Sequence, residues 1–291
     1  MAVKRQIPLP TLSGVAAGFT ATADIPIGPR YHQIWLRIAD GARHAFDSIV
    51  GEIRIKVNGK TQRVHTAAEL NALNKLMGPQ YSETHVAGTP DGVAYTLLPI
   101  FFGEPWRKRI EVGAGLAWAT GAWSTFQLEL DILAGASSPS VSGWAEVDSS
   151  VVTGAGNTAQ GTPSDRELVK VFKTNLAVNG TSQDVVTLPR RDRYTQISLI
   201  DPNISGVRVQ VEGITVRELS KEQIDAMLIA RDMVPVAGRT DLVFDDDDSL
   251  DSSLPMVIGN SVVNDFQLRL LLSSGTARNI GCIYQLLGRP E

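Results

Sequence analysis

The chain has 291 residues, enough for one large core or two ordinary ones, because domains of roughly 100 to 150 residues are the commonest size. Its 27 basic and 31 acidic side chains give a formal charge of −4, which argues against a surface built to neutralise nucleic-acid phosphates. The single cysteine, Cys282, excludes an internal disulfide, and its apolar neighbours indicate a buried thiol. The longest apolar runs fall far short of the ~20 residues that span a bilayer, so we expect a soluble chain that is not exported.

The first clear feature is a stretch that the chain contains twice. Residues 25–37 read IPIGPRYHQIWLR, and residues 188–200 read LPRRDRYTQISLI. Aligned without a gap, the stretches share six residues that lie 163 positions apart: Pro26/Pro189, Arg30/Arg193, Tyr31/Tyr194, Gln33/Gln196, Ile34/Ile197 and Leu36/Leu199. A repeat of this kind indicates two similar domains.

Each copy continues with a strand, a turn and a helix. Residues 53–57 and 207–211 alternate apolar and polar side chains, the period of a half-buried strand, and a glycine follows each run. Capping boxes at 66–69 and 220–223 predict that helices begin there. The helical spacing predicts that six side chains pack onto the sheets: Leu70, Leu73 and Met77 in the first helix, and Ile224, Met227 and Leu228 in the second.

A third matched element closes each copy. Residues 126–132 and 266–272 alternate again, beginning with Phe126 and Phe266. The offset between the copies falls from 163 at the tyrosines to 154 at the helices and 140 at the phenylalanines, so copy one carries the longer loops. Many short strands with frequent turn signals predict an all-β fold. We expect two tandem antiparallel eight-stranded jelly rolls with the same strand order, each with one short inserted helix.

A stretch rich in Gly, Ser and Thr separates the copies. Residues 149–165 read SSVVTGAGNTAQGTPSD and are nearly free of large apolar side chains, which is typical of a linker. We therefore expect jelly roll 1 with an N-terminal arm at residues 1–148, the linker at 149–167, and jelly roll 2 at 168–291.

Taken in order, these segments resemble a known family. They include GVAAGFTATADIPIGPRYHQIWLRI, EIRIKVNGKTQRVHTAAELNAL, FFGEPWRKR and WSTFQLELDI in the first half. The second half continues the resemblance from LVKVFKTNLAVNGTSQDVVTLPRRDRY to NIGCIYQLLG. The chain resembles the double jelly-roll major capsid proteins of tailless icosahedral phages with an internal membrane, of the corticovirus type.

The resemblance implies a structural role in the virion and no enzymatic activity. Homotrimers would form pseudo-hexagonal capsomers of an icosahedral shell around an internal membrane, after assembly in the host cytoplasm. Implied partners are the other copies of the trimer, neighbouring capsomers, a vertex protein, and the internal lipid membrane or its proteins, but no sequence-specific nucleic acid. The duplication suits this role, because two non-identical barrels per chain let a threefold oligomer occupy a sixfold lattice position.

The densest charge on the chain is an acidic run, Asp245, Asp246, Asp247 and Asp248, followed by Asp251. Carboxylates this close repel one another unless they are solvated or neutralised, and hard oxygen ligands suit calcium. The spacing is not that of an EF-hand loop, which favours a solvated loop tip. We predict a loop here and keep calcium as a candidate cofactor at these four aspartates.

Histidine usage argues against the main enzymatic alternative, a bicupin-like metalloenzyme. Such an enzyme needs clustered His and Glu ligands on facing strands. His32, His44, His65 and His85 all lie in copy one, and none forms a His-x-His pair. We predict ordinary surface or interface histidines and no catalytic residue.

Four tryptophans in the second half of copy one motivate a different alternative, a tandem jelly-roll carbohydrate- or receptor-binding protein. They are Trp106, Trp118, Trp123 and Trp144, and Arg107, Lys108 and Arg109 follow the first. Such a patch can bind sugars or headgroups, but barrel core and intersubunit contact explain it as well. Lys4 and Arg5 in the N-terminal arm are candidates for contact with anionic lipid.

Overall fold

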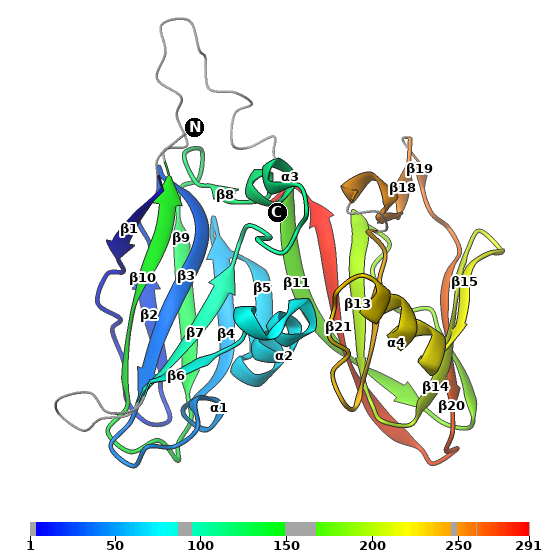
Figure 1. Cartoon of the computed structure of the whole chain (residues 1–291), viewed down its shortest axis with the longest axis horizontal. Coiled ribbons are helices and arrows are strands. Elements are labelled where there is room, and N and C mark those ends of the chain that lie inside the picture. Colours follow the sequence, from blue (N-terminus) through cyan, green and yellow to red (C-terminus); the bar gives the residue numbers. More distant parts are fainter. Residues whose placement is uncertain (1–3, 87–94, 149–166, 246–248, 260, 291) are drawn as a thin grey trace, which may run out of the picture. The chain divides into compact units, whose positions relative to one another are not determined.

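The computed structural model describes residues 4–86, 95–148, 167–245, 249–259 and 261–290. The chain divides into two compact units (Figure 1). Unit 1 comprises residues 1–75, 79–170 and 289–291, and unit 2 comprises residues 76–78 and 171–288. The predicted linker falls almost wholly on residues 149–166, outside the described residues, so the predicted domain boundaries stay a prediction.

Unit 1 is built from two antiparallel sheets. One has the order β1-β10-β3-β7 and the other contains β5-β4-β9-β2. The strands are β1 (Arg5–Pro8), β2 (Thr20–Asp24), β3 (Arg30–Ala39), β4 (Val50–Val57), β5 (Lys60–Thr66), β7 (Tyr95–Phe101), β9 (Phe126–Ile132) and β10 (Ser140–Asp148). Two short strands extend the first sheet: β6 (Thr84–Val86) beside β7, and β8 (Trp118–Ala119) beside β3.

Unit 2 repeats this arrangement. Its sheets have the orders β11-β21-β13-β16 and β12-β20-β14-β15. The strands are β11 (Leu168–Val178), β12 (Ser182–Val185), β13 (Arg193–Ile200), β14 (Ile204–Val211), β15 (Ile214–Ser220), β16 (Arg239–Val243), β20 (Phe266–Leu272) and β21 (Arg278–Gly288). Three further short strands lie between β16 and β20: β17 (Leu254–Pro255), β18 (Val257–Ile258) and β19 (Ser261–Val262).

Numbered by chain order within each unit, the two sets of sheets have the same strand order. The first strand of each unit pairs with the last, and the second pairs with the seventh. These are jelly rolls, and the predicted all-β fold and shared strand order are confirmed. The alternation of side chains is confirmed as well, since Phe126, Leu128, Phe266 and Leu268 all point into buried cores.

The inserted helices are α2 (Ala67–Met77) and α4 (Lys221–Ala230), and both begin at the predicted capping boxes. The Thr66 hydroxyl accepts from the Glu69 amide at 3.1 Å while Glu69 accepts from the Thr66 amide. Ser220 and Gln223 exchange the same two bonds. Two of the predicted packing residues were wrong. Met227 is 39% exposed, whereas its neighbour Leu228 is buried as predicted. Met77 belongs to unit 2 and packs against the core of that unit, not onto the sheet of copy one.

Unit 1 contains more helix than the sequence predicted. Besides α2 it has α1 (Phe46–Ile49), α3 (Ile110–Gly115) and a single 3-10 turn, η1 (Pro79–Tyr81), whereas unit 2 adds only the 3-10 turn η4 (Leu250–Ser252) within the described part of the chain. These short helices lie in the longer connections of copy one, whose offsets had indicated insertions. Over the residues described, no helix has the length and apolar character needed to cross a membrane.

Candidate functional site

The repeated stretch forms the same buried corner in both units. Tyr31 and Tyr194 are fully buried at the starts of β3 and β13. The Tyr31 hydroxyl donates to the carbonyl of Pro26 at 2.6 Å, and the Tyr194 hydroxyl donates to the carbonyl of Pro189 at 2.6 Å. Burial raises the pKa of Tyr31 to about 12, so both hydroxyls remain donors. The repeat therefore encodes a buried tyrosine–carbonyl hydrogen bond that fixes the segment before β3 and before β13.

The strand that follows each tyrosine carries the same irregularity. Pairing of β3 with β10 shifts between Glu146 and Val147, which leaves His32 out of register. Pairing of β13 with β21 shifts between Tyr194 and Gln196, which leaves Thr195 out of register. Bulges re-aim side chains without ending a sheet. The duplicated bulge places His32 in unit 1 where unit 2 has Thr195.

An internal arginine is also duplicated, and the sequence analysis missed it. The guanidinium of Arg63 on β5 lies 5.2 Å from the ring centroid of Phe102 and donates to the carbonyl of Phe101. That of Arg217 on β15 lies 4.9 Å from the ring of Phe244 and donates to the carbonyl of Val243 at 2.7 Å. Arg63 and Arg217 are 154 positions apart, as the capping boxes are. That shared offset was the signal that could have found them.

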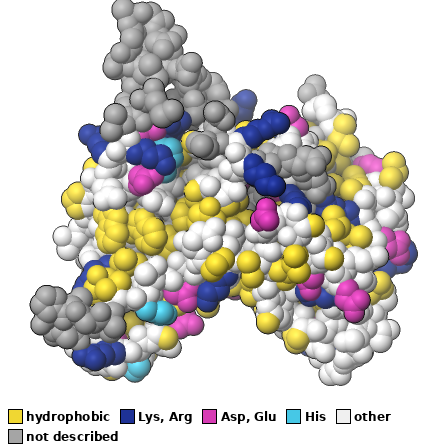
Figure 2. Space-filling model, viewed as in Figure 1, with side chains coloured by type: hydrophobic (Ala, Val, Ile, Leu, Met, Phe, Trp, Pro, Cys, Tyr) yellow, Lys and Arg dark blue, Asp and Glu magenta, His cyan; other side chains and the backbone are white. Residues whose placement is uncertain are grey.

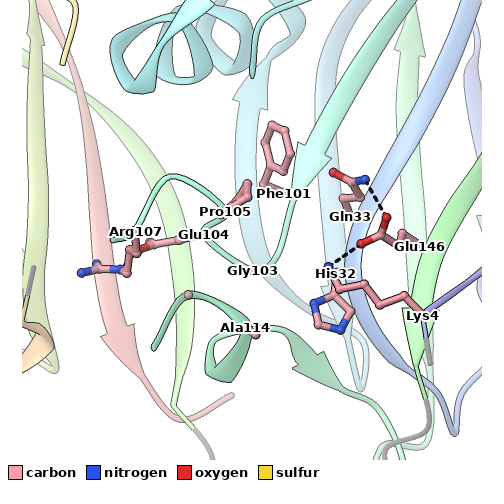
Figure 3. A pocket seen from close by; sticks show the side chains of 11 residues that line it. Lys4, His32, Gln33, Phe101, Gly103, Glu104, Pro105, Arg107, Ala114 and Glu146 are labelled. Atoms are coloured by element: carbon pink, nitrogen blue, oxygen red, sulfur yellow. Dashed lines mark hydrogen bonds and ion pairs between the residues drawn. The ribbon is translucent and has the colours of Figure 1, made fainter. Parts of the chain in front are cut away.

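A pocket in unit 1 with several charged side chains in its lining has a volume of about 160 Å³. Figure 3 shows Gln33 and Lys4 directed at Glu146 on one side of it and Arg107 beside Glu104 on another. Lys4 donates to Glu146 at 2.7 Å and Gln33 donates to Glu146 at 3.3 Å. Because these charged groups already bind one another, the side chains that line the pocket offer little net charge to attract a charged ligand.

His32 lies on this pocket and has its own buried partners. Its Nε2 atom is 3.0 Å from Asp148, which also accepts from Nε of Arg30 at 2.9 Å. Burial lowers the pKa of His32 and outweighs the hydrogen bond with Asp148, which raises it. Burial also acts to raise the pKa of Asp148, but the hydrogen bonds from Arg30 and His32 lower it overall. At neutral pH the group is an ion pair of Arg30 with Asp148 and a neutral imidazole.

The other histidines show that the prediction of surface histidines was half right. His44 and His85 have exposed side chains, at 43% and 66%. His65 on β5 is buried like His32. The described residues contain no group of three or more His, Cys, Asp or Glu side chains placed to hold a metal ion.

The four tryptophans do not form one cluster. Trp118 and Trp123 are buried in the core of unit 1, where their rings lie 5.7 Å apart. Trp106 is half-buried against Phe101 and Tyr81. Trp144 stacks on a tryptophan outside the predicted set, Trp35, at 6.2 Å. The sequence offered core packing as the other explanation, and it holds for the first pair.

Trp35 and Trp144 form part of an apolar stripe on the outer face of one sheet. Residues paired across four neighbouring strands contribute Pro8, Trp144, Trp35 and Pro99. Both tryptophans are half-buried and Pro8 is exposed, whereas Pro99 is buried. Figure 2 shows hydrophobic side chains gathered over β3 and β10. We call these four residues the tryptophan stripe.

The acidic run can be placed only at its first residue. Asp245 follows β16 outside any strand, and its carbonyl accepts from Arg231 at 2.6 Å. Asp251 lies in η4 with a side chain that is 97% exposed, 3.7 Å from Arg193. Asp246, Asp247 and Asp248 lie outside the described residues. Calcium binding at this run therefore stays a prediction.

The buried thiol is confirmed, since Cys282 is 1% exposed on β21 and burial raises its pKa to about 12.

Comparisons with known proteins find similarity to viral coat and capsid proteins. The family model described as viral coat protein P2 N-terminal domain matches residues 6–148. The major capsid protein P2 from bacteriophage PM2 superposes with a TM-score of 0.80 at 18% identity, over 99% of this chain and 98% of that chain. The STIV MCP gives 0.68 at 14% identity, over 99% and 97%. The PBCV-1 virus capsid gives 0.65 at 10%, over 98% and 93%. No curated protein sequence matches the chain.

Proposed function

We propose that the chain is a major capsid protein of the virion and that it assembles as a homotrimeric capsomer, because residues 6–148 match the viral coat protein P2 N-terminal domain and the fold is a double jelly roll. The observation that carries the trimer is the duplication. Two jelly rolls with one strand order but different surfaces let three chains supply six similar barrels. Three such chains then fill a sixfold position in an icosahedral lattice.

The contacts of such a trimer are head-to-tail. A twofold dimer uses the same surface patch on both chains and closes after two copies, so it would leave no sixfold outline. A ring that joins jelly roll 1 of one chain to jelly roll 2 of the next closes after three copies. An interface of this permanent kind should bury on the order of 2,000 Å² or more in total.

We also propose a shell around an internal membrane, with the N-terminal arm as the part of the chain that reaches lipid or membrane proteins. Lys4 and Arg5 are exposed and basic, and Lys4 also forms an ion pair with Glu146. Two charges contribute at most about 1 kcal/mol each near an anionic surface, but many copies on one shell multiply the effect. A vertex protein and neighbouring capsomers complete the proposed partners.

We infer that the chain has no catalytic activity, because the family model that matches residues 6–148 describes a viral coat protein. The alternative of a carbohydrate-binding protein is weakened, since two of the four tryptophans that motivated it are in the core. An oligosaccharide array tests it directly: a specific hit that needs Trp106 would revive it.

The trimer is tested by light scattering and electron microscopy of the purified protein. We expect three times the 31.4 kDa chain mass at micromolar concentration, and hexagonal outlines in negative stain. A monomer, or a dimer with jelly roll 1 against jelly roll 1, would overturn the proposal.

Thermal unfolding with and without calcium tests the prediction that the acidic run binds calcium. Replacing Asp246 and Asp248 together by Asn should lower the thermal midpoint in calcium but leave it unchanged in chelator. Equal midpoints in both media would leave only a solvated loop.

A further inference from the structure

The strands β5 and β15 occupy the same place in their jelly rolls, but of the two only β15 is an edge strand in the described sheets. Both follow the duplicated turn, and both have a bulge, opposite β4 and β14 respectively. The bulged residue of β5, Gln62, is fully buried, whereas the bulged residue of β15, Val216, is 45% exposed. Ile214 at the start of β15 is 70% exposed. An edge strand that exposes aliphatic side chains and backbone is a site for pairing with another chain.

In unit 1 a specific segment lies against β5. Residues 168–170, which begin β11, belong to unit 1. Leu168 is buried in the core of unit 1, and the carbonyl of Val169 accepts from Nε of Arg63 at 2.9 Å. Arg217 on β15 is the duplicate of Arg63. The duplication therefore shows what kind of segment fits beside β15: the beginning of the strand that opens a jelly roll.

The helices that follow these strands differ in exposure as the strands do, with the helix in unit 2 the more exposed. Leu73 on α2 is 6% exposed, while Met227, its equivalent on α4, is 39% exposed. Met227 lines a small pocket together with Arg217 and Leu219 of β15. Strand β15 and helix α4 therefore lie next to one another in unit 2, and each exposes apolar side chains. We define their exposed residues Ile214, Val216 and Met227 as the β15–α4 surface.

We propose that the β15–α4 surface binds a second copy of this chain at strand β1 and the tryptophan stripe beside it. β1 opens jelly roll 1 as β11 opens jelly roll 2, and each lies next to the last strand of its unit. β1 is an edge strand whose residues Arg5, Gln6 and Pro8 are exposed. Pro8 lies opposite Trp144 on the neighbouring strand, and Trp144 lies opposite Trp35. Apolar side chains are therefore present both on the tryptophan stripe and on the β15–α4 surface.

This inference rests on the proposed trimer and names its contact surfaces. It predicts that each chain presents β15 of jelly roll 2 to β1 of the next chain, which is a head-to-tail contact that closes as a ring. Large aromatic side chains are enriched at such interfaces, which agrees with the half-buried tryptophan pair.

Disulfide trapping tests the contact, and the chain suits it because Cys282 is buried and unreactive. Cysteines would be introduced singly on β1, as Arg5→Cys or Gln6→Cys, and combined with Thr215→Cys or Val216→Cys on β15. The four pairs cover both registers. The matched control replaces the β15 cysteine by Ser182→Cys on β12, the opposite edge of the same sheet and also exposed.

We expect at least one β1–β15 pair to form disulfide-linked oligomers under mild oxidation, and the β12 control to form none. A trimer in which none of the four pairs crosslinks would overturn this inference and leave the trimer standing. A monomeric wild-type protein would overturn both.

A charge substitution gives a second readout. Val216→Lys should convert the oligomer to folded monomer, whereas Val186→Lys, at a site that is 58% exposed on the chain before β13, should keep the oligomer. Circular dichroism would show that both variants fold. A folded Val216→Lys trimer with wild-type stability to dilution would count against the contact.

Discussion

Jelly roll 1 and jelly roll 2 are alike inside and different outside. Both have the corner tyrosine, Tyr31 or Tyr194, and the arginine over a phenylalanine, Arg63 or Arg217. Both also have the strand turn in which two successive residues have positive φ, Asn58-Gly59 or Glu212-Gly213, the geometry of a type I′ hairpin. The features that specify how a chain closes into a barrel have been kept in both copies.

The exposed faces of the two β-sheets have diverged in charge. In jelly roll 1, Arg54 on β4 lies opposite Glu129 and donates to it at 3.0 Å. At the equivalent pair in jelly roll 2, Arg208 lies opposite Arg269, which places two like charges together. Each is neutralised elsewhere, Arg269 by Asp184 at 2.6 Å. The ion-pair partners on the surface were therefore replaced while the strand register stayed the same, as expected if each surface meets a different neighbour.

The largest expected difference between the copies concerns the internal arginines. Arg63→Met should lower the free energy of unfolding by about 3 kcal/mol, because it leaves the carbonyls of Phe101 and Val169 without their donor in a buried site. Burial lowers the pKa of Arg63 to about 10, against the charge of Glu104, which raises it. Arg217→Met should cost about 1 to 2 kcal/mol, since Arg217 is only half-buried.

Denaturant unfolding measures both values. The control is Arg37→Met, which removes a half-buried arginine that lies over the Tyr95 ring and should cost below about 1 kcal/mol. Equal losses for Arg63→Met and Arg217→Met would show that the two sites are less different than their burial indicates.

Removing the hydroxyl of either buried tyrosine, Tyr31 or Tyr194, should lower the free energy of unfolding by the same amount. Tyr31→Phe and Tyr194→Phe each remove a buried hydroxyl and leave a proline carbonyl without its donor, at a cost of about 1 to 2 kcal/mol. Tyr95→Phe keeps the ring beneath Arg37 and serves as the control, with little change expected. Thermal midpoints suffice for the comparison. A loss in only one of the two corners would contradict their equivalence.

The part of the fold that follows from local rules could be predicted from the sequence. Alternation gave the strands around Phe126 and Phe266, and the capping boxes gave both helix starts, because these signals depend on neighbours in sequence. Met227 was mispredicted because 3.6-residue spacing does not say which of Met227 and Leu228 faces the sheet. His32 and Arg63 were missed as buried groups, since their partners Asp148 and Phe102 come from distant parts of the chain.

The capping boxes should contribute less than the corners. Thr66→Ala and Ser220→Ala each leave the first turn of a helix without its side-chain acceptor, which costs about 1 kcal/mol. Thr66→Ser and Ser220→Thr keep the hydroxyl and should restore most of the loss. Unfolding midpoints of the four variants make the test, and a full loss in Thr66→Ser would mean that the methyl group, and not the cap, stabilises α2.

The smallest expected effect is a pH dependence of stability that His32 contributes at the bulge of β3 and that Thr195, at the bulge of β13, cannot contribute. Burial lowers the pKa of His32 below its ordinary 6.5, so the folded chain takes up this proton less readily than the unfolded chain. As the pH falls through 6.5, the unfolded state gains a proton that the folded state does not, and stability falls. The loss is at most about 0.7 kcal/mol between pH 7 and pH 6.

His32→Thr gives jelly roll 1 the residue that jelly roll 2 has at its bulge, Thr195, and should remove this component. The thermal midpoint of the variant should therefore change less between pH 7 and pH 6 than that of the wild type. His85→Thr, at a side chain that is 66% exposed, should retain the wild-type pH dependence. Asp148 remains charged across this range, because the hydrogen bonds from Arg30 hold its pKa below its usual value. An unchanged pH dependence in His32→Thr would show that the imidazole is protonated equally in the folded and unfolded chains, and that the buried bulge imposes no cost on its charge.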